Sequence, residues 1–387
     1  MKKVLFTSTA LVAFAGAASA EVSLGGWAEM GVIGGDGLET QFFQDVDVDF
    51  TLSGETDSGL TFGANVDLDE AGNLGCTTCN QGVDIFVSGE FGTVTLGDTD
   101  GALDWAVAGV DAWGNPGSIA DDETAHWGRQ DSWLDGAYDG QILRYDYKTG
   151  DFGVAVSLEQ DDRSDLARTD ANGDVEDSDK YNWAVGATYA PQLGAGTLKL
   201  GLGYQQSDRG IVSLGITDAQ GADLTERLET AFANGDLDQD DLEFLETNFG
   251  YIPQNNEADK IAVALGDDAS IWALSAGYVT DSGISIGAVY SDWAGDELDE
   301  GSYWGIGGGY AYEAFSIHLN YGEHKFEGKA GGELKAKGYG LAMGYDLGGG
   351  LSVLAGYGKS EGTLSTGGRD FDFDASDTYS LGLSMSF

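Results

Sequence analysis

Long apolar runs, proline and basic residues are all scarce in this sequence of 387 residues. Beyond the first twenty residues no apolar run of 18 residues occurs, which excludes a helical membrane protein. Proline (3) is far below ordinary usage and glycine (62) far above it. The 18 basic residues are outnumbered by 66 acidic ones. So acidic a chain is not expected to bind nucleic acid, because phosphates are neutralised by Lys and Arg.

The first twenty residues have the pattern of an export signal. Lys2 and Lys3 precede an apolar stretch, and Ala18-Ser19-Ala20 supplies small residues for cleavage. The alternative, a transmembrane helix, needs a longer apolar run to cross about 30 Å of hydrocarbon. We therefore expect residues 1–20 to be a signal peptide. Without it, 16 basic residues stand against 66 acidic ones, a net charge of −50.

An alternation of polar and apolar residues is the main pattern of the remaining chain. In QDVDVDFTL, residues 44–52, Asp45, Asp47 and Asp49 alternate with valine and phenylalanine. Successive side chains of a strand point to opposite faces, so the acids share one face. In a soluble sheet that face would meet bulk water, and in a membrane barrel it would line a wet channel.

Two features of the repeated pattern favour the barrel. The off-phase positions are mostly Gly, Ser, Thr, Asn and Asp, which suits a water-filled interior. The apolar rows often end in Tyr or Trp, as aromatic girdles at the membrane interfaces do. Short turns alternate with long acidic segments, at 69–82, 98–140, 160–180, 206–269, 292–301, 322–336 and 359–376. We predict an all-β, transmembrane antiparallel barrel of about sixteen strands over residues 21–387, with both termini on the short-turn rim.

The sequence resembles a general porin of the kind found in photosynthetic and marine alphaproteobacteria. The matching segments are EVSLGGWAEMGVIGGDG, FTLSGETDSGLTFGANVDLDEAG, IFVSGEFGTVTLGD, DFGVAVSLEQDD, YDLGGGLSVLAGYG and the terminal YSLGLSMSF. The resemblance implies a sixteen-stranded barrel of the Gram-negative outer membrane, a homotrimer, and passive diffusion of small hydrophilic solutes. It also implies that the loop after the fifth strand, residues 98–140, folds into the barrel and constricts it.

One departure from the family concerns the charge of the barrel wall. The family places arginines on the wall opposite the acidic constriction loop, whereas here no Lys or Arg occurs between Glu21 and Gly128. Walls of one sign attract counter-ions, so we expect a cation-selective channel. The expected pore-lining residues are Asp45, Asp47, Asp49, Asp104, Asp111, Asp121, Asp122, Glu123, Arg129, Arg144 and Lys148.

Two loops carry weaker signals. Cys76 and Cys79 lie in an exported loop and are expected to form a disulfide; a zinc site would need further ligands, and a redox motif would need a helix after it. Asp170, Asn172, Asp174 and Glu176 alternate as calcium ligands do, although Tyr181 stands where an EF-hand needs its bidentate acid. We expect no cofactor, apart from weakly bound calcium at such loops.

The long segment 206–269 is expected to be a partly helical outer loop. Leu224, Leu228 and Phe232 have helical spacing, and residues 260–266 resemble an extra strand. This segment could cap the pore mouth or pack on the rim, and the sequence leaves both open.

An enzyme is not expected, because the three histidines have no orienting acid that the sequence identifies. Two alternatives to a diffusion porin remain. One is a sugar-specific channel with a stacking surface of four residues, Trp105, Trp113, Trp127 and Trp133. The other is a non-conducting structural or adhesive barrel. The expected partners are outer-membrane lipid, lipopolysaccharide and small solutes.

Overall fold

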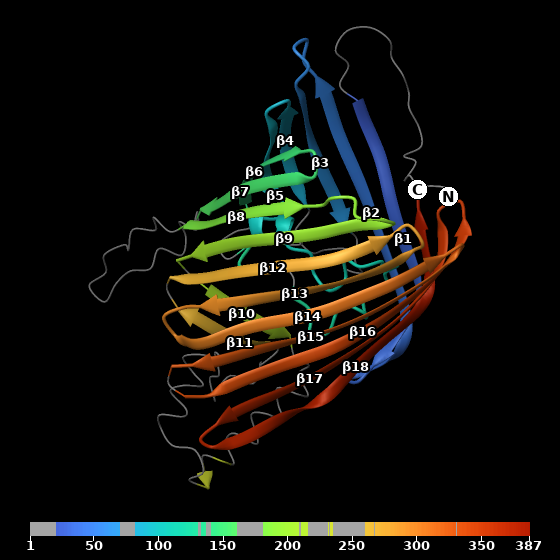
Figure 1. The fold of residues 1–387 in the computed structure, drawn as a ribbon. Coiled ribbons are helices and arrows are strands. Elements are labelled where there is room, and N and C mark those ends of the chain that lie inside the picture. The colour runs from blue at the N-terminus through green and yellow to red at the C-terminus, as the bar shows by residue number, and fades with distance from the viewer. Residues whose placement is uncertain are drawn as a thin grey trace.

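A closed antiparallel barrel of sixteen strands forms the body of this computed structural model (Figure 1). The structure describes residues 21–69, 82–130, 133–136, 141–160, 181–208, 210–215, 231, 233–234, 260–266, 268–329 and 331–387. Each strand pairs with its sequence neighbour, except that β9 pairs with β12 and β1 closes the barrel against β18. The predicted fold class and strand number are thereby confirmed. No helix among the described residues has the length and apolarity of a membrane span.

The barrel strands are short from β3 to β8 and longer on the rest of the barrel, with β2 and β18 the longest at 18 residues each. They are β1 (Glu21–Gly35), β2 (Leu38–Glu55), β3 (Thr61–Asp69), β4 (Val83–Gly89), β5 (Gly92–Asp98), β6 (Gln141–Thr149), β7 (Phe152–Gln160), β8 (Tyr181–Tyr189), β9 (Gly196–Ser207), β12 (Ala269–Thr280), β13 (Ile284–Ala294), β14 (Leu298–Tyr312), β15 (Phe315–Gly328), β16 (Glu333–Gly348), β17 (Leu351–Thr366) and β18 (Arg369–Ser386). A separate two-stranded sheet contains β10 (Gly210–Gly215) and β11 (Lys260–Gly266), so the extra strand predicted at 260–266 is present.

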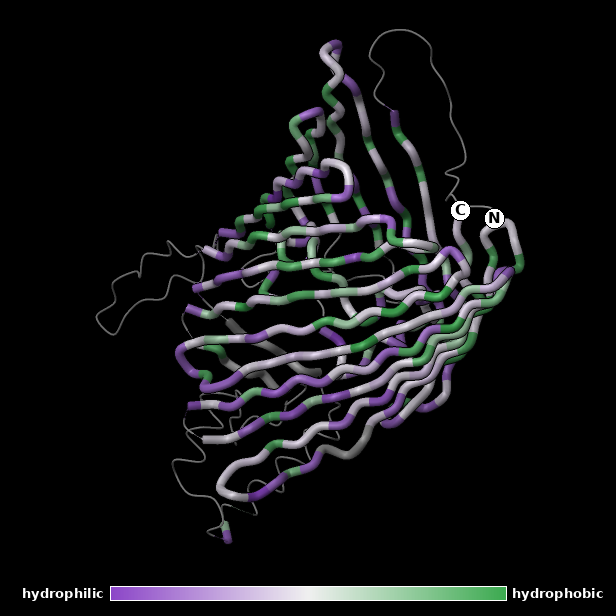
Figure 2. The backbone as a smooth tube through the Cα atoms, in the orientation of Figure 1, coloured by the Kyte–Doolittle hydropathy of each residue, from purple (hydrophilic) through white to green (hydrophobic). Residues whose placement is uncertain are grey.

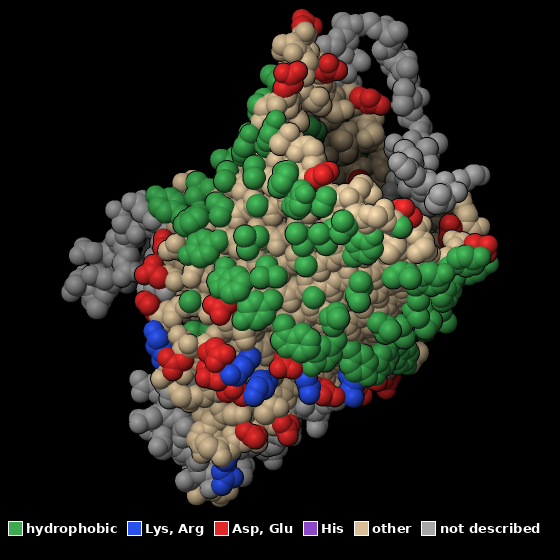
Figure 3. Space-filling view, viewed as in Figure 1, with side chains coloured by type: hydrophobic (Ala, Val, Ile, Leu, Met, Phe, Trp, Pro, Cys, Tyr) green, Lys and Arg blue, Asp and Glu red, His purple; other side chains and the backbone are tan. Residues whose placement is uncertain are grey.

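The alternation predicted from the sequence sets the two faces of the barrel. Val46 is 44% exposed on the outer surface, and the acids on either side of it point into the barrel. Along β13 the outward residues from Ile284 to Tyr290 are exposed, and every residue from Ser285 to Trp293 in the opposite phase is buried. Apolar side chains consequently cover the outer surface as a band (Figures 2 and 3).

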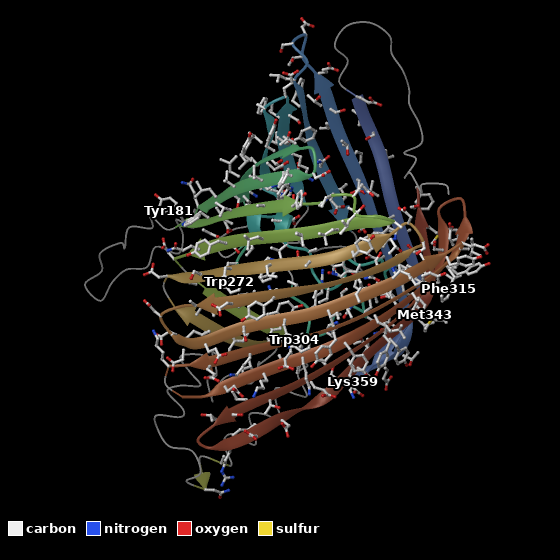
Figure 4. The ribbon with its side chains drawn as sticks, viewed as in Figure 1. Tyr181, Trp272, Trp304, Phe315, Met343 and Lys359 are labelled. Carbon is white, nitrogen blue, oxygen red and sulfur yellow. The ribbon has the colours of Figure 1, made fainter. Side chains whose placement is uncertain are left out.

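Aromatic residues border this apolar band in a continuous row. Trp183 packs on Tyr204 and Trp272 on Tyr290, with ring centroids 5.5 and 5.4 Å apart. The row continues through Trp304, which lies on the outer surface of β14 (Figure 4). Tyr321 pairs in register with Tyr339, and Tyr357 with Tyr379. The rings of Tyr339 and Tyr357 are also in contact, so the row continues to β18. Such a row is the expected position of a membrane interface, where aromatic rings meet headgroups.

Both ends of the described chain lie on one rim. Glu21 pairs with Ser53 near the short β2–β3 turn, and Phe387 donates its backbone N–H to the Gly26 carbonyl oxygen. The β16–β17 turn reaches the same rim, where Ser386 donates to the Gly350 carbonyl oxygen. This agrees with the predicted placement of the termini on the short-turn rim.

Three of the seven predicted long loops are mostly strand. Residues 292–301, 322–336 and 359–376 extend β13 to β18 and leave only short turns between them. Their outward residues are charged or polar, whereas inward residues such as Phe326, Leu334 and Leu364 are buried. The sequence pattern predicts loop because the outward phase has no apolar row.

A segment inside the barrel follows β5. We call it the inner loop: residues 99–130 and 133–136, including the short helix α1 (Ala102–Ala106). It crosses the inner face of ten neighbouring strands, β8 through β18 to β1. On each of these strands one glycine faces it, and together they form the glycine strip: Gly186, Gly201, Gly277, Gly287, Gly307, Gly322, Gly340, Gly358, Gly382 and Gly31.

The glycine strip exists because the inner loop approaches the wall too closely for side chains. A Cβ added to Gly307 would lie under 3.0 Å from the Val110 carbonyl oxygen, and one on Gly340 would meet the Glu123 carbonyl oxygen equally closely. These inward glycines were interpreted as lining a water-filled interior. In the structure they contact protein instead, and the wetted lumen lies on the other side of the inner loop.

Replacing Gly307 by alanine should destabilise the barrel by about 1–3 kcal/mol, the usual cost of overpacking. The inner loop must then move away from β14 into the lumen, so single-channel conductance should fall. Thermal melting and planar-bilayer recording measure the two effects. Gly25→Ala is the matched control, because a Cβ there meets only ordinary contacts at 3.8 Å or more. Equal behaviour of the two variants would show that the close approach is not required.

Candidate functional site

The two ends of the inner loop are joined to the wall by a buried hydrogen-bond network. Asp135 accepts hydrogen bonds from the Gly101 backbone N–H at 2.7 Å and from Gln205 Nε2 at 2.6 Å. Asn182 Nδ2 donates to the Leu134 carbonyl oxygen at 2.5 Å and to the Glu159 carboxylate at 3.0 Å. Strands β7, β8 and β9 therefore hold the start and the end of the inner loop together.

A second network holds the far part of the inner loop. The Glu123 carboxylate accepts from Asn115 Nδ2 at 3.0 Å and from the Ser118 hydroxyl. Asn320 of β15 donates through Nδ2 to the Glu123 carbonyl oxygen at 2.8 Å. The same Asn320 contacts His126 through Oδ1, at 2.5 Å from Nε2. A lumen-facing asparagine thus pairs with two points of the inner loop at once.

His126 is neutral in this arrangement. Its Nδ1 accepts the Gly128 backbone N–H at 3.0 Å, so the proton lies on Nε2, which donates to Asn320. Burial lowers the pKa of His126 to about 4. His126 therefore acts as an uncharged anchor and contributes no positive charge to the lumen near neutral pH.

The tip of the inner loop carries an exposed acid that faces other acids. Asp121 adopts a left-handed backbone, φ 51°, and its side chain is exposed. It acts electrostatically on Glu29 of β1, as Asp45 and Asp47 of β2 do. Desolvation by the surrounding protein, followed by the nearby Glu123 carboxylate, raises the pKa of Asp121, although Arg129 opposes this. Glu29 is 6% exposed and lies on β1, where the glycine strip ends, so this group of acids gathers at the end of the wall that the inner loop follows.

The acidic surface continues across the neighbouring strands. Asp45 pairs in register with Glu29, and Asp49 with Asp67. On β4, Asp84 accepts hydrogen bonds from Asn65 Nδ2 at 3.1 and 3.0 Å. The wall formed by β1 to β4 thus carries acidic residues on each of its four strands. It has no basic residue among its described positions.

The basic residues predicted for the pore all have partners. Arg129 lies 3.3 Å from the Asp111 carboxylate within the inner loop. Arg144 pairs with Asp146 at 3.4 Å and donates to the Asp100 carbonyl oxygen at 2.6 Å. The Nζ atom of Lys148 lies 5.0 Å from the centroid of the Trp105 ring. Aspartates therefore offset the charges of the two arginines locally, whereas the ring beside Lys148 leaves its positive charge in place.

Two of the predicted pore-lining acids do not face the pore. Asp122 is 5% exposed and Glu123 is 1% exposed, because both lie between the inner loop and the wall. The prediction was wrong for this pair: a run of three acids cannot all point into the lumen when the backbone that carries them follows the wall. Asp104, Asp111 and Arg129 are half-buried, whereas Asp49, Asp121 and Lys148 are exposed.

The four tryptophans predicted as a stacking surface are separated. Trp113 is fully buried where Gly277 and Gly287 face the inner loop. Trp133 is buried against Trp293 and Tyr303, with ring centroids 6.0 and 6.5 Å apart. Half of the proposed surface is therefore unavailable to a solute.

The sequence prediction missed the residues that hold the inner loop, together with Glu29. Asn182, Gln205 and Asn320 occupy inward strand positions, where the sequence pattern predicts polar side chains in contact with water. The position of Glu29 beside the acids of β2 can be recognised only once the β1–β2 register is known. Cys76, Cys79, Asp170, Asn172, Asp174 and Glu176 lie outside the described residues, so the disulfide and the calcium ligands stay predictions.

Comparisons with known proteins agree with this architecture. A family model described as Gram-negative porin matches residues 7–235 and 228–365. A protein named porin from Rhodobacter capsulatus is 31% identical over 307 residues, covering 75% of this chain and 89% of that protein.

Solved structures show the same fold. A porin structure refined at 1.8 Å resolution has a TM-score of 0.58 and 21% identity, covering 95% of this chain and 100% of that one. OmpT, an outer membrane protein of Vibrio cholerae, has a TM-score of 0.56 and 13% identity, with 95% and 98% covered.

The buried Asp135 should make stability depend on pH. Burial raises its pKa to about 7 from an ordinary value of 3.8. Folding therefore favours the protonated acid, and stability should fall as pH rises from about 4 to about 7. Thermal melting across this range should show a shallower decline in Asp135→Asn. The exposed turn variant Asp57→Asn should keep the full decline, and identical slopes in the two variants would refute this assignment.

Proposed function

The chain belongs to the Gram-negative porin family, and we propose that this outer-membrane barrel is a cation-selective channel for passive diffusion of small hydrophilic solutes. The family is one of channels and not of enzymes. The observation that carries the selectivity is the exposed Asp121 at the tip of the inner loop, beside a wall of β1 to β4 that has acids and no basic residue at its described positions. The inner loop would be the constriction that sets the size and charge of passing solutes.

The charge of the two walls supports cation preference. Opposed rows of acids and bases would create a transverse field, whereas acids without opposing bases create a negative potential along the path. Arg129 and Arg144 are each paired with an aspartate, so the remaining charge near the inner loop is negative. A cation entering this region replaces part of its hydration by carboxylate contacts, and an anion is repelled.

The alternative of a sugar-specific channel has less support. A stacking surface needs exposed aromatic faces in series, and Trp113 and Trp133 are buried. The non-conducting barrel is distinguished by recording, because folded protein would then give no channels. Loop-bound calcium remains part of the expectation.

The homotrimer is also part of this proposal. Large apolar side chains on the outer surface of β1 and β2 are strongly exposed in a single chain, among them Val22, Leu24 and Phe42. In a trimer such residues would be covered by neighbouring copies, and three channels would open in one unit.

The zero-current potential under a KCl gradient tests the proposed selectivity. We expect the cation-selective sign for the unmodified protein, and a several-fold lower K⁺/Cl⁻ permeability ratio in Asp45→Asn/Asp121→Asn, because two negative charges inside the barrel are removed. Asp57→Asn lies in an exposed turn and should leave the ratio unchanged. An anion-selective sign, or no difference between the variants, would overturn the proposal.

Arg129 provides the opposite test. Arg129→Gln removes the partner of Asp111 and should raise the K⁺/Cl⁻ ratio, since that aspartate would then act unopposed. The same charge change in Lys329→Gln, on the β15–β16 turn, is the control, and both ratios come from the same KCl gradient. If Arg129→Gln lowered the ratio, the pair would not be the local charge balance described above.

A further inference from the structure

A tryptophan on the inner face of the acidic wall is not explained by the fold or by the constriction. Trp27 lies two residues before the inward Glu29 on β1, and side chains two residues apart share a face of a strand. It pairs in register with Asp47 of β2 and with Ser386 of β18, the strands on either side of β1 (Figure 1). Trp27 is 42% exposed, so its ring meets the lumen and not the lipid.

A hydroxyl group of the neighbouring strand holds the Trp27 ring in place. Trp27 Nε1 donates a hydrogen bond to Ser384 Oγ of β18 at 2.7 Å. Ser384 pairs in register with Glu29, and its hydroxyl donates to the Glu29 carboxylate. The indole N–H is thus bonded within the wall, which leaves the aromatic ring as the group that a solute in the lumen can contact.

Carboxylates surround the Trp27 ring on the same face of the wall. Asp47 lies directly opposite it in register, with Asp45 and Asp49 two residues away on the same strand. Asp121 of the inner loop lies near enough to act electrostatically on Glu29, as Asp45 and Asp47 do. The charge around the ring is therefore negative from three elements: β1, β2 and the inner loop.

Little basic charge opposes these acids. The described positions of β1 to β4 have no Lys or Arg, and the inward residues of β18 beside Trp27 are Ser384 and Ser386. Arg129 acts on Asp121, but it lies 3.3 Å from the Asp111 carboxylate. The surroundings of Trp27 thus favour a positively charged solute.

Glu29 gives an independent indication of a missing positive partner. Its side chain is 6% exposed, and its Oε1 atom has no hydrogen-bond partner among the described residues. A carboxylate is costly to bury without compensation, so a cation bound beside it lowers that cost. In the described part of the chain, no three Asp, Glu, His or Cys side chains form a group that could hold a metal ion. A larger, organic cation fits this spacing of the carboxylates better.

We propose that Trp27, with Asp47 and the neighbouring acids, forms a binding site in the lumen for small quaternary ammonium ions. The face of a tryptophan ring attracts such cations, and the attraction is strongest for this aromatic side chain. The methyl groups would pack on the ring, and the carboxylates would supply the negative charge. The site names a solute class for the cation-selective channel proposed above, and it rests on that function.

Block of the single-channel K⁺ current by choline tests this site. The uncharged probe is neohexyl alcohol, in which a carbon atom replaces the nitrogen of choline. In planar bilayers, choline should reduce the current through the unmodified protein in a saturable way, and the alcohol should not. The half-blocking concentration of choline should rise about fivefold in Trp27→Leu, the usual loss for one exposed cation–π contact.

Two further variants serve as controls. Trp272→Leu removes a tryptophan of the outer aromatic row and should be blocked as the unmodified protein is. Trp27→Phe keeps a ring at the site and should have an intermediate half-blocking concentration. Far-ultraviolet circular dichroism checks that each variant is folded.

Equal block of the unmodified protein and Trp27→Leu by choline would overturn the site, and so would equal block by choline and neohexyl alcohol. Failure of the proposed function has a different signature. An anion-selective zero-current potential of the unmodified protein would overturn both proposals, whereas a cation-selective potential without choline block would overturn the site alone.

Discussion

Close contact between the inner loop and the glycine strip is the constraint on which the rest of the structure depends. Ten neighbouring strands each supply a glycine at the line of contact, so the inner loop can follow the wall without filling the lumen. Polar anchors then fix the register of the inner loop: Asp135 with Gln205 at its ends, and Asn320 with His126 farther along. The passage that remains lies between this reinforced wall and the opposite strands.

The charge of the passage follows from that placement. A backbone held on one wall turns Asp122 and Glu123 toward that wall and leaves Asp121 exposed at the tip, facing the acids of β1 and β2. The neutral His126 and the paired arginines add little opposing charge. On the outer surface, the lysines beyond the aromatic row of β15 to β17 pair with carboxylates such as Glu361.

Strand pattern alone was sufficient to predict the barrel, its strand number, the aromatic row and the outward direction of Val46, because alternation is local and repeats. The anchors of the inner loop could not be predicted, since Asn182, Gln205 and Asn320 resemble any wetted polar residue until the loop is placed beside them. The same ambiguity affected the glycines: a residue without a side chain gives no sign of whether water or backbone faces it. Strand extension past residue 292 was missed because acidic alternation resembles loop.

Hydrogen–deuterium exchange of the intact protein is the most direct measurement of the central claim that the inner loop is part of the wall. The account predicts that amides of residues 101–107 and 118–129 exchange on the time scale of the barrel strands, because wall contacts and hydrogen bonds such as Asp122 N–H to Ser118 protect them. Exchange as fast as that of the exposed turn at Thr56–Gly59 would contradict it. The inner loop would then be a detachable segment, and the charge of the passage would not be set by its contacts with the glycine strip.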